Sequence, residues 1–149
     1  MASIRVLVAD DFEPWRRSVC SMLKGQAESE VVAEATDGWE AIQKAQTLKP
    51  DLILLDPGLP NLNGMDAAKR IREVVPGARI ILLTSSNDKD VVRAALSTGA
   101  QGYVLKIDAS TELLPAVAAV LGGNVFVSSG MNRERRCEAE EWRVLSKLH

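Results

Sequence analysis

The chain has 149 residues, of which 18 are Lys or Arg and 20 are Asp or Glu, giving a formal charge of −2. This length suits one domain whose core needs neither disulfides nor metal, and the charge balance argues against a nucleic-acid-binding or polybasic membrane-surface protein. Its apolar runs are strand-sized, no apolar leader opens it, and Cys20 and Cys137 lie at no metal-binding or redox spacing. We therefore expect a cytoplasmic globular protein that does not enter a membrane.

Two kinds of apolar pattern alternate along the chain. Short runs typical of strands lie at residues 4–9, 31–35, 52–55, 80–83 and 103–105. Helical patterns follow them: the first begins near Pro14, the second begins at Trp39 and ends before Pro50, and the others span residues 65–75, 88–96 and 110–121. Trp15 and Trp39 are expected to pack on helix faces, and Val74 is expected to point inward. Five strand–helix alternations predict an α/β domain of the doubly wound kind, a five-stranded parallel sheet with helices on both faces.

Residues 131–149 differ in character from residues 1–130, which we take as the domain. The tail holds five basic and four acidic side chains in an interleaved order. Its apolar stripe consists of Trp142, Val144, Leu145 and Leu148. The pattern predicts a short amphipathic helix that docks on the domain or pairs with a second copy of the chain as a homodimer. Because the charges are interleaved, we expect this chain alone to bind duplex DNA no better than nonspecifically.

Carboxylates follow two of the expected strands. Asp10 and Asp11 come after the first strand, and Asp56 comes after the third. Since parallel strands end at the same edge of a sheet, we expect these three side chains to converge. Clustered carboxylates repel one another, and oxygen ligands favour a hard divalent cation. The pattern therefore indicates a site for Mg²⁺, or for Mn²⁺ in its place.

Two further polar side chains reach the same edge, Thr84 after the fourth strand and Lys106 after the fifth. An acidic metal site beside a lysine and a hydroxyl is what phosphoryl transfer requires, with one Asp as the nucleophile. Each of these residues alone has an ordinary structural role, such as a helix cap or a solvated charge. All five together favour the functional interpretation.

Four segments also carry a family resemblance: Val8-Ala9-Asp10-Asp11, Leu54 through Gly64, Thr84-Ser85, and Gly102 through Lys106. Over about residues 3–130 the chain resembles the receiver domains of two-component response regulators. Residues 122–128 are similar to the subfamily whose receivers precede a LuxR-type helix-turn-helix output domain. The resemblance implies a flavodoxin-like fold with strand order 2-1-3-4-5 and phosphorylation by a sensor histidine kinase or phosphotransfer protein. It also implies a receiver that catalyses its own phosphoryl transfer and hydrolysis, and not an enzyme with a separate substrate.

The resemblance further implies a role for each residue of the cluster. Asp56 is expected to accept the phosphoryl group, and Thr84 and Lys106 are expected to contact it. The implied metal ligands are Asp11 directly, Asp10 largely through water, Asp56, and the backbone carbonyl of Gly58. Tyr103 is the implied switch, which turns inward on phosphorylation and reshapes the surface formed by the fourth helix, fifth strand and fifth helix.

The chain departs from the family pattern at three places. Pro57 removes a backbone donor next to the phosphoacceptor, Gly58 offers no side chain over the phosphoryl group, and Ile107 follows Lys106 where Pro is frequent. None of these changes removes a reacting group.

Other functions fit the residues less well. An aspartyl-nucleophile phosphohydrolase needs Asp-x-Asp after the first strand, whereas Asp10 and Asp11 are adjacent. A flavodoxin-like nucleotide binder needs a Gly- or hydroxyl-rich loop there, and Asp-Asp-Phe-Glu would repel phosphate. Two receiver roles stay open: a stand-alone receiver that docks or relays phosphate, and the receiver part of a transcription regulator. Only one residue follows Leu148, so we expect no DNA-binding domain in this chain.

Overall fold

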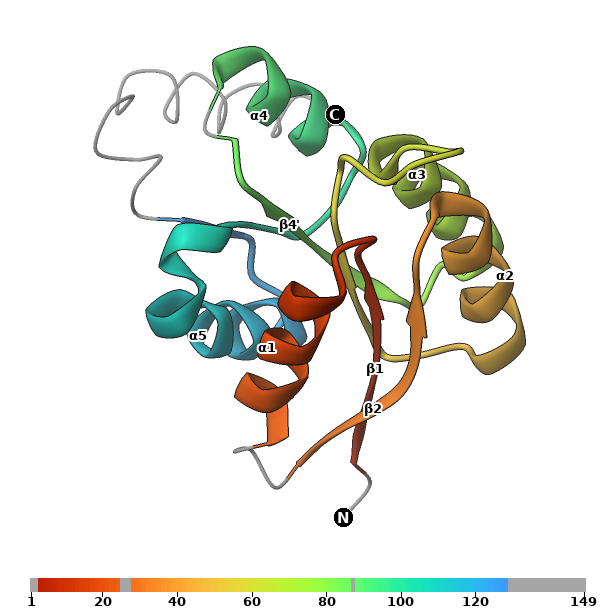
Figure 1. Cartoon of the computed structure of the whole chain (residues 1–149), viewed down its shortest axis with the longest axis horizontal. Helices are drawn as coiled ribbons and strands as arrows, with labels where there is room; N and C mark the ends of the chain where they lie inside the picture. Colours follow the sequence, from red (N-terminus) through yellow and green to blue (C-terminus); the bar gives the residue numbers. More distant parts are fainter. Residues whose placement is uncertain (1–2, 25–27, 87, 129–149) are drawn as a thin grey trace.

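The computed structural model describes residues 3–24, 28–86 and 88–128. In these residues, six parallel strands form one sheet in the order β2-β1-β3-β4-β5-β6 (Figure 1). The strands are β1 (Ile4–Ala9), β2 (Ser29–Ala35), β3 (Leu52–Leu55), β4 (Arg79–Thr84), β5 (Gly102–Leu105) and β6 (Phe126–Val127). The flavodoxin-like α/β fold and the order of the first five strands are confirmed.

Helices connect successive strands. They are α1 (Glu13–Lys24), α2 (Gly38–Leu48), α3 (Gly64–Val74), α4 (Lys89–Ser97), α5 (Ala109–Leu121) and the short 3₁₀ helix η1 (Lys106–Asp108). Side chains that accept backbone N–H groups set several starts: Asp37 caps α2, Asn63 caps α3 and Asp88 caps α4. Gly99, with φ of +84°, follows the end of α4 in the left-handed conformation that glycine adopts freely.

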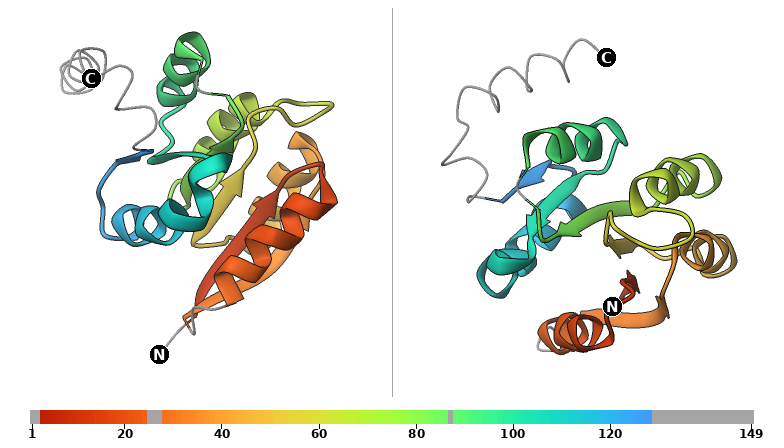
Figure 2. Two further views of the ribbon diagram at one scale, coloured as in Figure 1. Left: turned by 60° about the vertical axis from the view of Figure 1, so that its left-hand side comes forward. Right: turned by 45° about the horizontal axis from the view of Figure 1, so that its top comes forward.

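The helices cover both faces of the sheet (Figure 2). One buried apolar cluster receives side chains from α2, α3 and α4, and a second receives them from α1 and α5. Along β1, Leu7 and Ala9 belong to the first cluster, whereas Val6 and Val8 belong to the second, because successive side chains point to opposite faces. Burial on both faces explains why the central strands show no polar alternation.

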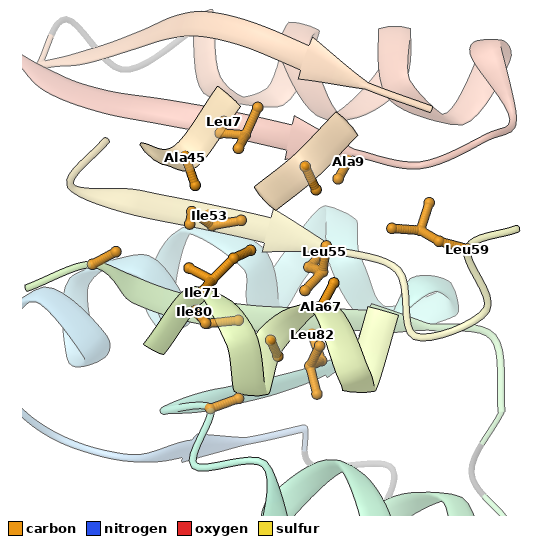
Figure 3. Close-up of a cluster of buried hydrophobic side chains, with 14 of the residues drawn as sticks. Leu7, Ala9, Ala45, Ile53, Leu55, Leu59, Ala67, Ile71, Ile80 and Leu82 are labelled. Atoms are coloured by element: carbon orange, nitrogen blue, oxygen red, sulfur yellow. The ribbon is translucent and has the colours of Figure 1, made fainter. Parts of the chain in front are cut away.

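Figure 3 shows the first cluster, in which Leu7 of β1 lies beside Ala45 of α2, and Ile53 and Ile80 of β3 and β4 lie beside Ile71 of α3. All five side chains have no exposed surface. Each fully buried Leu or Ile stabilises the fold by about 1.5–3 kcal/mol relative to an exposed one. This packing holds the strands, and hence the loops at their carboxyl ends, in one position.

The prediction of five strands was wrong by one strand. β6 pairs with β5 through Gly102 and Phe126 and through Tyr103 and Val127. Two residues are too few to show an apolar period, and the strand becomes visible only through its pairing. Its presence means that β5 is not an edge strand.

Two side-chain orientations also differ from the expectation. Val74, the last residue of α3, is 43% exposed, because Ile71 and Val75 at a spacing of four already occupy the inward face. Trp39 is 50% exposed on α2, where the Arg70 guanidinium lies 5.0 Å from its ring centroid. The expected amphipathic tail, with Cys137 and Trp142, lies outside the described residues. No helix in the described ranges is long and apolar enough to cross a membrane.

Candidate functional site

The three carboxylates that sequence analysis placed at one edge lie together in the structure. β1 and β3 pair so that Ala9 stands opposite Leu55, and the next residues of the two strands are therefore neighbours. One oxygen each from Asp10, Asp11 and Asp56 can be chosen so that all three lie within 4.8 Å of one another. Asp10 is buried, Asp56 is half-buried and Asp11 is exposed.

Lys106 joins this cluster from the end of β5, at the start of η1. Its Nζ atom lies 2.7 Å from Asp10 Oδ2 and 3.3 Å from Asp56 Oδ2. Burial alone would lower the pKa of Lys106, but the hydrogen bond to Asp10 and the charge of Asp56 outweigh it and raise that pKa above its ordinary value. Three carboxylates and one ammonium leave a formal charge of −2, which matches the charge of one divalent cation.

Asp56 is the first residue of the loop that leads from β3 to α3. Its Oδ1 atom accepts the Gly58 N–H at 2.9 Å, while Oδ2 faces Lys106. Burial raises the pKa of Asp56 above its ordinary value, against the opposing effects of the Gly58 N–H and of Lys106. A partly desolvated carboxylate of this kind is stabilised by any further positive charge that reaches it.

Gly64, the first residue of α3, packs closely against the backbone of Asp56. The Gly64 N–H donates to the Pro57 carbonyl at 2.8 Å. A Cβ atom at position 64 would lie 1.9 Å from the Asp56 backbone oxygen, far inside contact distance. Glycine is required here by the close approach of α3 to the backbone of Asp56, and not by a left-handed backbone conformation.

Thr84 lies at the end of β4, opposite Leu105 and thus beside the strand end that carries Lys106. The side chain is buried, and its hydroxyl accepts the Ser86 N–H at 3.1 Å. The Tyr103 hydroxyl donates to the Ser86 carbonyl at 3.0 Å. Ser86 therefore connects the expected phosphoryl contact to the expected switch.

Tyr103 is fully buried on β5, between β4 and β6, with no exposed surface. The side chain thus already lies inward in this structure, whereas the family resemblance implied that it turns inward on phosphorylation. Burial raises its pKa to about 12, and the Thr84 hydroxyl opposes that effect. Because β6 pairs with β5 at Gly102 and Tyr103, this tyrosine does not lie at an edge of the sheet.

Two residues of α1, Arg16 and Trp15, also support the cluster, and neither was expected from the sequence to contact it. Arg16 donates to the Asp10 carbonyl at 2.8 Å and pairs with Glu34 of β2 at 3.0 Å. The Trp15 ring lies against Lys106, with its centroid 5.3 Å from Nζ. The contacts of Arg16 with Glu34 and of Trp15 with Lys106 cross between different elements of the fold, and no local period reveals them.

The donor set fits a hard cation. Carboxylate oxygens from Asp10, Asp11 and Asp56 are ligands that Mg²⁺ and Mn²⁺ prefer, and no soft donor stands among these residues. Gly58, the fourth expected ligand, is exposed and directs its N–H toward Asp56.

The fold and this site define a class of signalling domain, and comparison with known proteins identifies it. The family model of the response regulator receiver domain matches residues 6–118, and the chain belongs to that family. It is 31% identical over 145 residues to the transcriptional regulatory protein LnrK of Bacillus subtilis (strain 168), covering 97% of this chain and 64% of LnrK. It is 37% identical over 150 residues to the response regulator protein VraR of Staphylococcus aureus (strain Mu3 / ATCC 700698), covering 97% of this chain and 71% of VraR.

Solved structures agree with this assignment. A two-component response regulator of the LuxR family from Aurantimonas sp. SI85-9A1 is 30% identical with a TM-score of 0.86, covering 93% of this chain and 99% of that one. The isolated REC domain of RcsB from Salmonella enterica serovar Typhimurium, with the phosphomimetic BeF₃⁻, is 28% identical with a TM-score of 0.82. That match covers 88% of this chain and 97% of the RcsB domain.

Proposed function

We propose that this receiver takes a phosphoryl group on Asp56 from a histidine kinase or phosphotransfer protein, in a reaction that requires Mg²⁺. The observation that carries the proposal is the position of Lys106, whose Nζ atom reaches both Asp10 at 2.7 Å and Asp56 at 3.3 Å. A lysine shared by two carboxylates beside a third is suited to neutralise an incoming dianionic group.

In this proposal Asp56 is the nucleophile. One of its carboxylate oxygens attacks phosphorus, and the bond to the donor's histidine nitrogen breaks with its electron pair remaining on that nitrogen. The Gly58 N–H at 2.9 Å orients the carboxylate by holding Oδ1. Lys106 faces Oδ2 and is placed to follow the transferred group as its charge develops.

Asp10, Asp11, Asp56 and the carbonyl of Gly58 would hold the metal ion. Mg²⁺, when bound, supplies the positive charge that a −2 cluster needs before an anionic substrate can approach. Arg16 keeps Asp10 in place through the backbone carbonyl at 2.8 Å. Hydrolysis of the aspartyl phosphate at the same residues would return the receiver to its starting state.

The proposed output runs through Thr84, Ser86 and Tyr103. If the Thr84 hydroxyl turns to the phosphoryl group, it releases the Ser86 N–H that it now accepts at 3.1 Å. Ser86 also accepts from Tyr103, so this rearrangement biases the switch residue and the surface of α4, β5 and α5. It is a shift between two packings of one fold.

The direct test is phosphorylation of the purified chain. Acetyl phosphate with Mg²⁺ should add one phosphoryl group, seen as a mass increase, and EDTA or Asp56→Asn should abolish it. Asp90→Asn is the matched control, since Asp90 is an exposed carboxylate on α4, outside the cluster. Undiminished labelling of Asp56→Asn would contradict the assignment.

We further propose that residues 1–130 form the receiver and that it serves a transcriptional output. Ser128 supports this extent, because its buried hydroxyl contacts Asp108 at 3.1 Å and so joins the end of the β6 segment to η1. The names of the relatives support the output, and the chain spans 64% of LnrK and 71% of VraR.

The tail and the output can be tested separately. Removal of residues 131–149 should change sedimentation or lower the melting temperature if that segment docks on the receiver or pairs two copies. The mass of the protein isolated from its native host distinguishes a stand-alone receiver from one that carries an output domain.

A further inference from the structure

On α1, the Trp15 ring lies against the ammonium of Lys106. The ring centroid is 5.3 Å from Nζ, within the range of an attractive cation–π contact. The Lys106 side chain is only 20% exposed, so the contact is partly shielded from water. The Trp15 ring is therefore a third neighbour of the Lys106 ammonium, after the carboxylates of Asp10 and Asp56.

Hydrogen bonding by the indole nitrogen does not explain why position 15 holds a tryptophan. In the described part of the chain, Trp15 Nε1 is the buried side-chain nitrogen or oxygen that has no hydrogen-bond partner. Burial of an unpaired N–H is unfavourable, and Phe would fill the second apolar cluster without it. What Trp offers over Phe is the larger and more negative ring face, which is the best aromatic surface for a cation.

Lysine particularly needs such support. Its charge sits on a flexible four-carbon stem, and a lysine that swings into solvent no longer faces the phosphoacceptor. Asp10 holds Nζ at 2.7 Å and Asp56 at 3.3 Å, and both are themselves expected to bind other groups in the reaction. The Trp15 ring, by contrast, is a neighbour of Lys106 that is expected to bind neither the metal nor the phosphoryl group.

We infer that Trp15 is a positioning residue, which holds the Lys106 ammonium over Asp10 and Asp56 and thereby increases the rate at which Asp56 is phosphorylated. The kinetic part rests on the proposed function, whereas the contact itself does not. The chain also provides a matched control. Trp39 makes a similar contact with Arg70 at 5.0 Å, but between α2 and α3, and neither residue belongs to the carboxylate cluster.

The contact is tested by NMR without any reaction. The face of an aromatic ring shields nuclei above it, so the Lys106 ε-methylene protons should resonate upfield, with Lys106→Met identifying the signal. Trp15→Phe should keep part of that shift, Trp15→Leu should remove it and Trp39→Leu should not change it. An ordinary shift in the native protein would overturn the inference, even if a Trp15 variant failed to fold.

The consequence is tested by the initial rate of labelling with acetyl phosphate and Mg²⁺. Trp15→Leu should slow labelling by about five-fold, Trp15→Phe should slow it less, and Trp39→Leu should match the native rate. An unchanged rate in Trp15→Leu would show that Trp15 does not affect labelling. An equal loss in Trp15→Phe and Trp15→Leu would show that packing and not the ring face matters. Either outcome would overturn the inference. If the native chain is not labelled at all, the proposed function fails, and the NMR result alone decides whether Trp15 holds Lys106.

Discussion

Replacing Gly64 by Ala should misplace Asp56, the proposed phosphoacceptor. The new Cβ would lie 1.9 Å from the Asp56 backbone oxygen, whereas a normal carbon–oxygen contact is about 3.3 Å. The start of α3 and the end of β3 must therefore separate by roughly 1.4 Å. Both are held, because the Gly64 N–H donates to Pro57 and the Asp56 N–H donates to Ala9.

Two effects on stability compete in this variant. Forcing an atom into a closely packed backbone costs about 1–3 kcal/mol, and this contact lies at the severe end of that range. Alanine is the better helix former by at most about 1 kcal/mol, and less at the first residue of a helix. We expect Gly64→Ala to lower the free energy of unfolding by about 2 kcal/mol, or the melting temperature by roughly 6 °C. Since a displacement of ~1 Å can slow a reaction ~100-fold, labelling of Asp56 should fall by one to two orders of magnitude.

Gly77→Ala is the matched control for urea unfolding and for mass-spectrometric labelling. Nothing lies within 4 Å of a Cβ atom built at position 77, and Gly77 has no left-handed φ. Its replacement should leave labelling unchanged and raise stability by about 0.4–1 kcal/mol, because it restricts the unfolded chain. If Gly64→Ala and Gly77→Ala unfolded at the same urea concentration and were labelled at the same rate, the close contact with Asp56 would have no role.

Three further outcomes follow from the charges of the site and from its buried phenol. Tyr103, the chain's one tyrosine, should ionise near pH 12, as followed by tyrosinate absorbance. The phenol of the unfolded chain ionises near pH ~10, so the stability that Tyr103 contributes below pH ~10 should be lost as the pH rises through 12, by about 3 kcal/mol in total. Titration of the folded protein near pH ~10 would contradict this. Lys106→Met leaves Asp10 and Asp56 without their cation. Urea unfolding in EDTA should therefore show that the free energy of unfolding falls by at least about 2 kcal/mol at neutral pH, and Mg²⁺ should restore part of it. An unchanged free energy of unfolding in EDTA would refute the pairing. Asp11→Asn should weaken Mg²⁺ binding and raise the melting temperature of the metal-free protein, because one of three clustered negative charges is removed; unchanged Mg²⁺ affinity would remove Asp11 from the metal site.

The candidate site of this receiver could be predicted from sequence because it depends on strand ends. Asp10, Asp56, Thr84 and Lys106 each follow an apolar run, and parallel strands bring such positions together whatever the details of packing. The alternation of strand and helix patterns was enough to predict the sheet, its helices and the convergence of the carboxylates. These features depend on local apolar periodicity and on the rule that connections between parallel strands are right-handed.

Other features depend on contacts between distant segments and were decided only by the tertiary structure. β6 exists as a strand because β5 lies beside it, and Gly64 is required because α3 touches the backbone of Asp56. Trp15 was expected only to pack on a helix face, yet its ring contacts Lys106, 91 positions away in the chain. A local pattern records which face of an element is apolar, but the partner of each side chain is set by how the packed elements meet in space.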